Sequence, residues 1–177
     1  MPKNERRLYN LKGHLHFVTF STYKRRNILA EEACARIVVG NLNLTQKRMN
    51  AYCVGFVVMP NHVHALIGFD GDPAIDILMR EWKKLSSIKI RGYYENTGRP
   101  DLVDQFKTPQ GNFRIWQRKY YDFLVYSHEK HLEKMNYMHN NPVKWGIVTK
   151  AVDYKFSSAR FYDLEKTTGV EITKVGF

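Results

Sequence analysis

Apolar residues recur along this chain at two different intervals, and each interval predicts a type of secondary structure. Alternating apolar and polar positions, with many β-branched and aromatic residues, are typical of strands. Apolar residues spaced three and four apart indicate amphipathic helices. By these criteria the predicted strands cover residues 14–23, 51–58 and 62–69, and the predicted helices cover residues 31–44 and 74–93.

The order of these elements predicts an α+β fold. A closing strand near residues 112–116 would complete the order β-α-β-β-α-β, which is typical of a ferredoxin-like (RRM-like) split β-α-β fold with an antiparallel sheet. The polar passage 96–112 contains two glycines and two prolines, and it is predicted to be a loop.

A further helix and a tail are predicted to follow this fold. Ser127 can cap a helix that runs through Met135 and Met138 and ends before Pro142, because the residue before a proline disfavours helical backbone. Residues 143–177 are expected to form a docked, extended tail. The chain, residues 1–177, is thus predicted to be a single domain whose core covers about residues 14–142.

The composition indicates a globular protein with a polyanionic partner. Hydrophobic residues make up 44% of the chain and aromatic residues 14%, which is too apolar for a disordered segment. The 28 Lys and Arg residues against 17 Asp and Glu residues give a net charge of +11. Because neutralising phosphates releases counterions, an excess of this size favours nucleic acid.

Basic residues gather on one face of the predicted helix 74–93 and beside a pair of tyrosines. A solvated helix face is the alternative interpretation, but only Asp76 and Glu81 interrupt the basic residues. The candidate DNA-binding residues are Arg80, Lys83, Lys84 and Arg91 on the helix, with Arg118 and Lys119 beside the tyrosines.

The sequence also indicates where the protein works and what it does not use. Cys34 and Cys53 lack a Cys-x-x-Cys pairing, so neither a disulfide framework nor a zinc knuckle is predicted. The N-terminal segment has no apolar signal-peptide core, and no apolar run is long enough to span a membrane. A cytoplasmic, nucleoid-associated protein without a membrane partner is expected. No phosphate-binding Gly-x-x-x-x-Gly-Lys loop occurs, so no nucleotide cofactor is expected.

Two histidines in the predicted strand 62–69 are candidate metal ligands. His62 and His64 are two residues apart, so their side chains would project from the same face of the sheet while Val63 enters the opposite layer. A structural histidine is the alternative for any isolated His-x-His, but a hairpin would hold both rings rigidly. His14 and His16 form a second pair with the same spacing.

Tyr120 and Tyr121 are candidate nucleophiles, because Arg118 and Lys119 beside them would favour a phenolate or hold a phosphate. Most tyrosines are packing residues, so the pair alone is weak evidence. Two imidazoles and one oxygen ligand would leave open positions on a divalent ion, which could polarise a phosphodiester. A tyrosine would then form a covalent phosphotyrosine that preserves the bond for rejoining.

Four ordered motifs resemble the single-tyrosine HUH transposases (IS200-like), especially the branch associated with repetitive extragenic palindromes (REP). The resemblance covers about residues 14–162. The motifs are Met59-Pro60-Asn61-His62-Val63-His64, Trp116-Gln117-Arg118-Lys119-Tyr120-Tyr121-Asp122, Tyr137-Met138-His139-Asn140-Asn141-Pro142-Val143-Lys144 and Phe156-Ser157-Ser158-Ala159-Arg160.

The resemblance implies a metal-dependent transposase that nicks and joins single-stranded DNA next to a hairpin. It implies that His62 and His64 bind Mg²⁺ or Mn²⁺. It also implies that Tyr120, four residues after Trp116, is the nucleophile, and that a C-terminal helix carries or follows this tyrosine. The glutamine that often supplies a third ligand one turn beyond the tyrosine is replaced by Leu124. Asp122 is the expected substitute. A monomer or a homodimer is compatible with the resemblance.

Three other functions are less consistent with the sequence. A non-cleaving protein that binds DNA hairpins would need only the basic helix and the aromatic residues. An RNA-recognition module would carry a Gly-Phe aromatic strand signature, which is missing. A zinc deaminase would carry His-x-Glu and a later Pro-Cys-x-x-Cys, and neither occurs. Three further histidines are interpreted as helix-surface or capping groups: His128, His131 and His139.

Overall fold

The computed structural model describes residues 5–7 and 15–176 of the chain. The strands are β1 (Glu5–Arg7), β2 (Leu15–Ser21), β3 (Ala51–Met59), β4 (His62–Phe69), β5 (Tyr121–Val125) and β6 (Lys174–Gly176). The α-helices are α1 (Glu32–Arg48), α2 (Ile75–Asn96), α3 (Pro100–Gln105), α4 (His128–Lys144) and α5 (Ala159–Leu164). Three short 3₁₀ helices are η1 (Tyr23–Arg25), η2 (Ile28–Ala30) and η3 (Ala151–Asp153).

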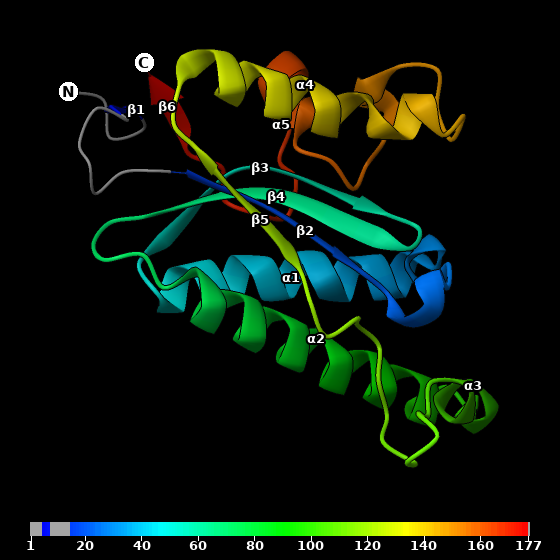
Figure 1. Ribbon diagram of the computed structural model, residues 1–177. Helices are drawn as coiled ribbons and strands as arrows, with labels where there is room; N and C mark the ends of the chain where they lie inside the picture. The colour runs from blue at the N-terminus through cyan, green and yellow to red at the C-terminus, as the bar shows by residue number, and fades with distance from the viewer. Residues whose placement is uncertain (1–4, 8–14, 177) are drawn as a thin grey trace.

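Four strands form one antiparallel sheet in the order β3-β4-β2-β5 (Figure 1). Strand β2 thus lies between β4 and β5, and β3 lies at the edge beyond β4. This is the predicted ferredoxin-like split β-α-β plan, and the α+β fold class is confirmed. β1 and β6 pair in parallel in a separate two-stranded sheet, where the two ends of the chain meet.

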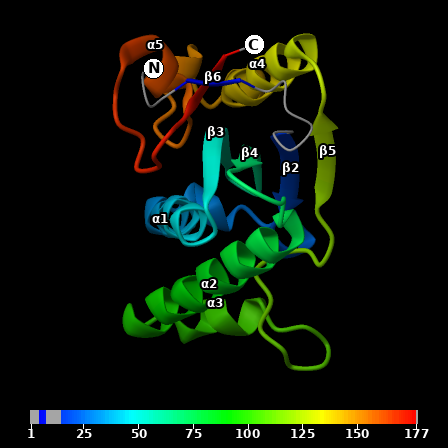
Figure 2. The same ribbon diagram turned by 90° about the vertical axis from the view of Figure 1, so that its left-hand side faces the viewer.

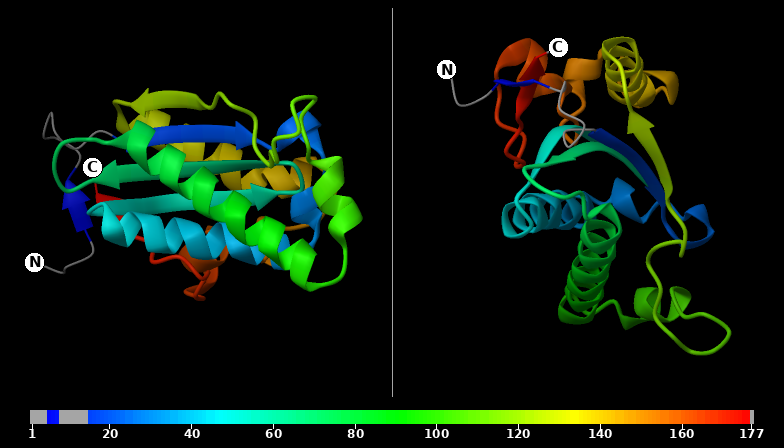
Figure 3. Two further views of the ribbon diagram at one scale, coloured as in Figure 1. Left: turned by 90° about the horizontal axis from the view of Figure 1, so that it is seen from below. Right: turned by 60° about the vertical axis from the view of Figure 1, so that its left-hand side comes forward.

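One face of the sheet is covered by α1 and α2, which cross it side by side (Figures 2 and 3). Trp82 of α2 is fully buried there, and its ring lies 4.8 Å from that of Phe20 in an edge-to-face arrangement. Its indole N–H donates to the carbonyl of Val38 on α1 at 2.9 Å, so the polar atom that it buries is satisfied. This face therefore holds the larger apolar core.

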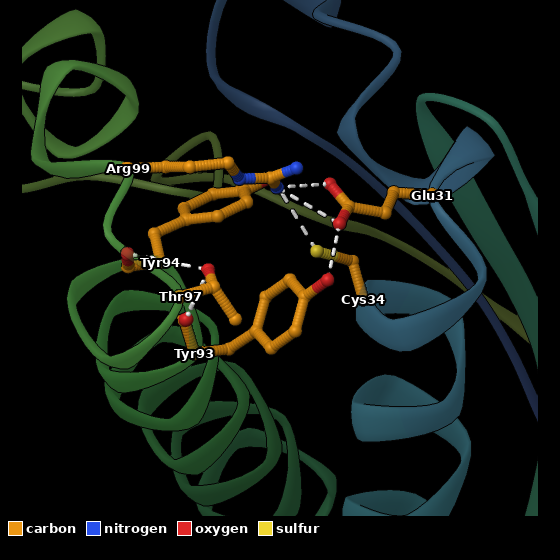
Figure 4. Close-up of polar contacts among 6 residues, drawn as sticks. All are labelled: Glu31, Cys34, Tyr93, Tyr94, Thr97 and Arg99. Carbon is orange, nitrogen blue, oxygen red and sulfur yellow. Dashed lines mark hydrogen bonds and ion pairs between the residues drawn. The ribbon is translucent and has the colours of Figure 1, made fainter.

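A polar cluster joins α1 to the segment that follows α2 (Figure 4). The carboxylate of Glu31 accepts hydrogen bonds from the Arg99 guanidinium at 2.6 and 2.8 Å and from the Tyr93 hydroxyl. The Cys34 thiol lies 3.4 Å from the Tyr94 hydroxyl. These contacts fix the end of α2, and with it α3, against the start of α1.

The opposite face of the sheet is covered by α4, with α5 beside it (Figure 1). Met135 and Met138 of α4 pack against strand residues that include Phe17 and Leu66. A Cβ atom built on Gly55 of β3 would lie only 2.7 Å from the terminal methyl of Met138. The ends of the Met135 and Met138 side chains thus fill the space beside Gly55, where α4 packs on the sheet.

Three sequence predictions are corrected. The closing strand is β5, not residues 112–116, which make only isolated bridges. Edge strand β5 is largely exposed, so its apolar alternation is weak. The predicted loop 96–112 contains α3, which begins at a proline suited to a first turn. Ser127 does cap α4, but the helix continues through Pro142, whose missing N–H costs one bond close to the helix end.

The two cysteines and the apolar content of the helices bear on the predictions about disulfides and membrane spans. Cys34 and Cys53 are both buried free thiols, and burial raises the pKa of Cys34 to about 11, which keeps this thiol protonated. Within residues 5–7 and 15–176, no helix is both long enough and apolar enough to cross a membrane.

Candidate active site

His62 and His64 of β4 point to the α4 face of the sheet, as the alternation predicts. Their ring centroids are 4.8 Å apart, and both side chains are buried. Val63 between them belongs to the core on the α1 and α2 face. The two imidazoles therefore lie side by side under α4.

Hydrogen bonds orient both rings. The Nδ1 atom of His64 is 2.7 Å from the Thr19 hydroxyl, and Nδ1 of His62 is 2.8 Å from the side-chain oxygen of Asn61. Asn61 is itself held by an amide contact to Asn27 at 3.1 Å. With Nδ1 as the N–H donor in each ring, each Nε2 atom keeps a lone pair. These are the tautomers that a metal-binding histidine requires.

Burial keeps both imidazoles neutral. Loss of hydration and, to a smaller extent, the nearby Arg25 cation together lower the pKa of His62 to about 4. Burial and the neighbouring His62 lower the pKa of His64 to about 3. At neutral pH both rings are thus uncharged and able to bind a cation.

Helix α4 places two further side chains at the histidines, Tyr137 and Asn141. The ring of Tyr137 lies 5.2 Å from that of His64, and the tyrosine is 45% exposed. The amide nitrogen of Asn141 lies 3.0 Å from Nε2 of His64. Because these residues are four apart on a helix, they project from the same face, one turn from each other. Trp145, at the end of this helix, lies 5.4 Å from His62, measured between ring centroids.

The side-chain oxygen of Asn141 is buried and has no hydrogen-bond partner. An unsatisfied buried acceptor costs about 1–3 kcal/mol. The amide nitrogen faces Nε2 of His64, so a half-turn of the amide would bring the oxygen to this imidazole, where both could bind one cation. Two imidazole nitrogens and one amide oxygen are a suitable donor set for a divalent ion with open positions. Among the described residues no group of three His, Cys, Asp or Glu side chains could hold a metal, but the third donor here is an amide.

Tyr120 and Asp122 do not lie at the histidines. Asp122 pairs across β2 with Val18, on the α1 and α2 face, and both of its oxygens are 3.0 Å from Nδ1 of His16. Tyr120 packs against the core on that same face, where burial and the charges of Asp122 and Asp76 raise its pKa. The structure thus places the predicted nucleophile and the predicted third ligand on the face opposite His62 and His64, and their roles stay predictions.

Tyr121 lies on the same face as His64. It pairs with Thr19 on β2, which in turn pairs with His64 on β4, so the three side chains form one row across the sheet. The sequence analysis left Tyr121 as an alternative, but it did not identify Tyr137 or Asn141. Their spacing of four in a helix with a strong N-cap was the signal that could have indicated them.

The remaining histidines are placed away from this row. His14 lies outside the described residues, and His16 faces the opposite side of the sheet. His128 is exposed at the start of α4, as interpreted. His131 is buried, and His139 hydrogen-bonds the hydroxyl of Ser158 at 2.8 Å, so these two are packing residues rather than surface groups.

The candidate DNA-binding residues lie on and beside α2, on the far side of the sheet from the histidines. Arg80, Lys84 and Arg91 are exposed, and Arg91 is ion-paired with Glu95 at 2.8 Å. Lys83 is half-buried, because its ammonium donates to the carbonyls of residues 117 and 118 at 2.7 and 2.9 Å. Arg118 and Lys119 are exposed in the loop before β5.

The fold and the site define an α+β protein with a ferredoxin-like sheet that carries paired histidines beneath a tyrosine-bearing helix. The sequence profile of the family described as "Transposase IS200 like" matches residues 8–141, and the chain belongs to this family.

Two curated relatives and two solved structures resemble the chain. The REP-associated tyrosine transposase of Escherichia coli K12 is 25% identical over 159 residues, covering 88% of this chain and 82% of that protein. An uncharacterized protein of Haemophilus influenzae is 26% identical over 98 residues, or 51% of this chain. The match spans about half of that protein, 53% of its length.

The structures show the same fold. A REP-associated tyrosine transposase bound to a REP hairpin matches with a TM-score of 0.68 at 20% identity, covering 98% of this chain and 94% of the other. A candidate transposase from Deinococcus radiodurans matches with a TM-score of 0.53 at 18% identity, covering 79% and 97% of the two chains.

Proposed function

We propose that this chain is a metal-dependent single-strand DNA endonuclease and strand transferase that acts at hairpins of the REP type through a 5′-phosphotyrosine. The observation that carries the proposal is the meeting of His62, His64 and Asn141 beside the half-exposed Tyr137. His62, His64 and Asn141 would hold Mg²⁺ or Mn²⁺. When bound, the ion would polarise the phosphodiester as a Lewis acid.

Tyr137 is the proposed nucleophile. Its oxygen would attack the phosphorus and form the Tyr–O–P bond while the P–O3′ bond breaks. The phenol would give its proton to solvent, and the leaving 3′-oxygen would take one up from solvent to become a free 3′-hydroxyl. Attack by the 3′-hydroxyl of another strand would reverse the step and free the tyrosine. The bond energy is conserved throughout, so no nucleotide cofactor is required.

The proposed site is complete within one chain. Two residues separate β5 from α4, and α4 packs on the sheet that carries the histidines. A monomer is therefore sufficient for the chemistry. The net charge of +11 and the exposed basic residues of α2 support a polyanionic substrate. The relative with the same fold is bound to a REP hairpin, which supports a hairpin as the substrate class.

The covalent adduct tests this proposal. Labelled single-stranded DNA containing palindromes from the encoding genome would be incubated with the protein and Mn²⁺, and adducts would be resolved on a denaturing gel. We expect Tyr137→Phe to abolish the adduct, while Tyr120→Phe and Tyr121→Phe retain it. Loss of the adduct only in Tyr120→Phe would restore the sequence hypothesis and contradict this one.

The alternative function is a hairpin-binding protein that does not cleave. It is distinguished by the same experiment, because such a protein would shift the hairpin on a native gel but form no adduct with any palindrome that it binds.

A further inference from the structure

A pocket of about 290 Å³ lies beside the candidate nucleophile. It is lined by Phe17, Thr19, His64, Tyr121, Glu133, Lys134 and Tyr137. Its size is at the lower end of the ~300–1,000 Å³ typical of small-molecule sites, which fits a group no larger than a nucleoside. Because His64 and Tyr137 belong to both, the pocket is continuous with the candidate active site.

Aromatic rings form much of this pocket. The ring of Phe17 stacks on that of His64 with 5.5 Å between centroids and an angle of 14° between planes. Tyr121 enters from edge strand β5 and is 54% exposed, so its ring is not required by the apolar core. A flat group entering here would therefore meet Tyr121 and Tyr137, two rings whose exposed surfaces have no comparable packing role.

A fixed cation lies beside these rings. The ammonium of Lys134 is 5.4 Å from the ring centroid of Phe17 and 4.6 Å from that of Phe123. Glu133 pairs with Lys134 at 3.1 Å and with Lys130 at 2.6 Å, which holds both lysines at this end of α4. The backbone phosphate of a nucleotide whose base enters the pocket would meet the Lys134 ammonium, together with the Glu133 carboxylate that pairs with it.

We infer that this pocket holds one unpaired nucleobase of the DNA strand, the base next to the phosphate that Tyr137 attacks, and that Tyr121 stacks on it. The inference rests on the proposed function for the position of that phosphate. Aromatic rings beside fixed cations are the combination that binds single-stranded nucleic acid, and stacking tolerates every base because each has a π-face. Tyr121 is thus a substrate-positioning residue, which fixes the strand relative to the nucleophile.

A double-mutant cycle between protein and DNA tests this contact. All proteins would carry Tyr137→Phe, so that the DNA stays uncut, and binding would be measured by fluorescence anisotropy. The hairpin would be compared with hairpins that lack one base at a time in the single-stranded segments flanking the stem. We expect removal of one flanking base and Tyr121→Ala each to weaken binding about 5- to 100-fold, with no further loss when the two are combined.

Two matched variants separate stacking from loss of structure. Tyr121→Phe keeps the ring and should bind like the parent. Tyr126→Ala is the control, because Tyr126 is 65% exposed and nearby in sequence but does not line the pocket. Any loss of binding that it causes should simply add to the loss caused by each missing base. Independent, additive effects of Tyr121→Ala at all flanking positions would overturn the inference.

The result of the binding cycle can be distinguished from the result of the adduct assay that tests the proposed function. Suppose that neither the parent protein nor any variant forms an adduct, but that the effects of Tyr121→Ala and of one missing base are non-additive. The base site then stands and the cleavage proposal falls. If the adduct forms at Tyr137 and no coupling is found, the cleavage proposal stands and the base site falls.

Discussion

The two faces of the central sheet differ in what their side chains bury. The face under α1 and α2 is filled by apolar residues, and its central Trp82 has its only polar atom satisfied. The face under α4 buries His62, His64 and the amide of Asn141, whose oxygen has no partner. The first face is arranged for stability, whereas the second keeps polar atoms dehydrated at a free-energy cost. Stability and catalysis should therefore respond to mutations on opposite faces.

Asn141→Leu should have the largest effect on activity. It removes the proposed third ligand while keeping the branching of the side chain, and losing a direct ligand should exceed the 10–100-fold cost typical of supporting residues. Metal-dependent cleavage should thus fall by more than about 100-fold. The free energy of unfolding should change by no more than about 1 kcal/mol, because a hydrogen bond and an unsatisfied oxygen disappear together.

Urea denaturation and a cleavage assay on the same preparation check this prediction. A variant that cleaves normally would remove Asn141 from the site. A variant that has lost cleavage and several kcal/mol of stability would show that the amide is structural.

Trp82→Ala tests the opposite face and should have the largest effect on stability. Removing a fully buried tryptophan typically costs about 3–5 kcal/mol, partly through the cavity that remains. The fraction that stays folded at low temperature should retain the site, because the Trp82 indole donates to Val38 of α1 and packs on Phe20, both on the opposite face of the sheet. The midpoint of urea unfolding, and adduct yield per folded molecule, measure the two effects.

Acid should destabilise the protein partly through His139 on the α4 face. Burial lowers the pKa of His139 to about 4, against a small opposing effect of Asp163, while an unfolded histidine titrates near 6.5. Between these values the unfolded chain binds a proton that the folded chain does not, so the free energy of unfolding falls as the pH falls. The contribution is fully present above about pH 6.5, and up to about 3 kcal/mol is lost by pH 4.

His139→Gln should make the pH dependence of stability shallower in this window by up to one proton. Urea unfolding at intervals between pH 4 and 7 measures it, and His128→Gln on the exposed start of the same helix is the control. An unchanged slope in His139→Gln would show that this imidazole titrates normally in the folded protein.

Charge removal on α2 should have the smallest effect. Lys84→Gln removes an exposed cation far from the histidines, and each lost phosphate contact lowers the slope of log affinity against log salt by about 0.7–0.9. Lys83→Gln should also lower the unfolding free energy, because the Lys83 ammonium holds the loop before β5. Anisotropy titrations at several salt concentrations test both, and an unchanged slope would place the DNA on the α4 face alone.

The sequence was sufficient for three of the four strands of the central sheet, β2, β3 and β4, and for the positions of the histidine pair, because local patterns determine them. Alternation placed His62 and His64 on one face with Val63 on the other, and the hairpin fixed the strand. The REP-associated resemblance and the family were also confirmed.

Pairing register, however, is a long-range property. Tyr120 and Tyr121 point to opposite faces, and only the row formed by Tyr121, Thr19 and His64 decides which one faces the histidines. The same register directs Asp122 to the face opposite the histidines. Tyr137 and Asn141 reach the site through the packing of α4 on Gly55, which no local pattern in the helix predicts.

The tail after α4 has a further consequence for the sheet edges. Strand β3 is nine residues long and nearly all buried, and its outer edge is bridged by Ser157 and Ile172 of the tail. The opposite edge strand, β5, is only five residues long and largely exposed. Long apolar edges can template intermolecular pairing, whereas short ones rarely do. Proteolytic loss of the tail would therefore expose the edge of β3 and make the protein prone to aggregate through this strand.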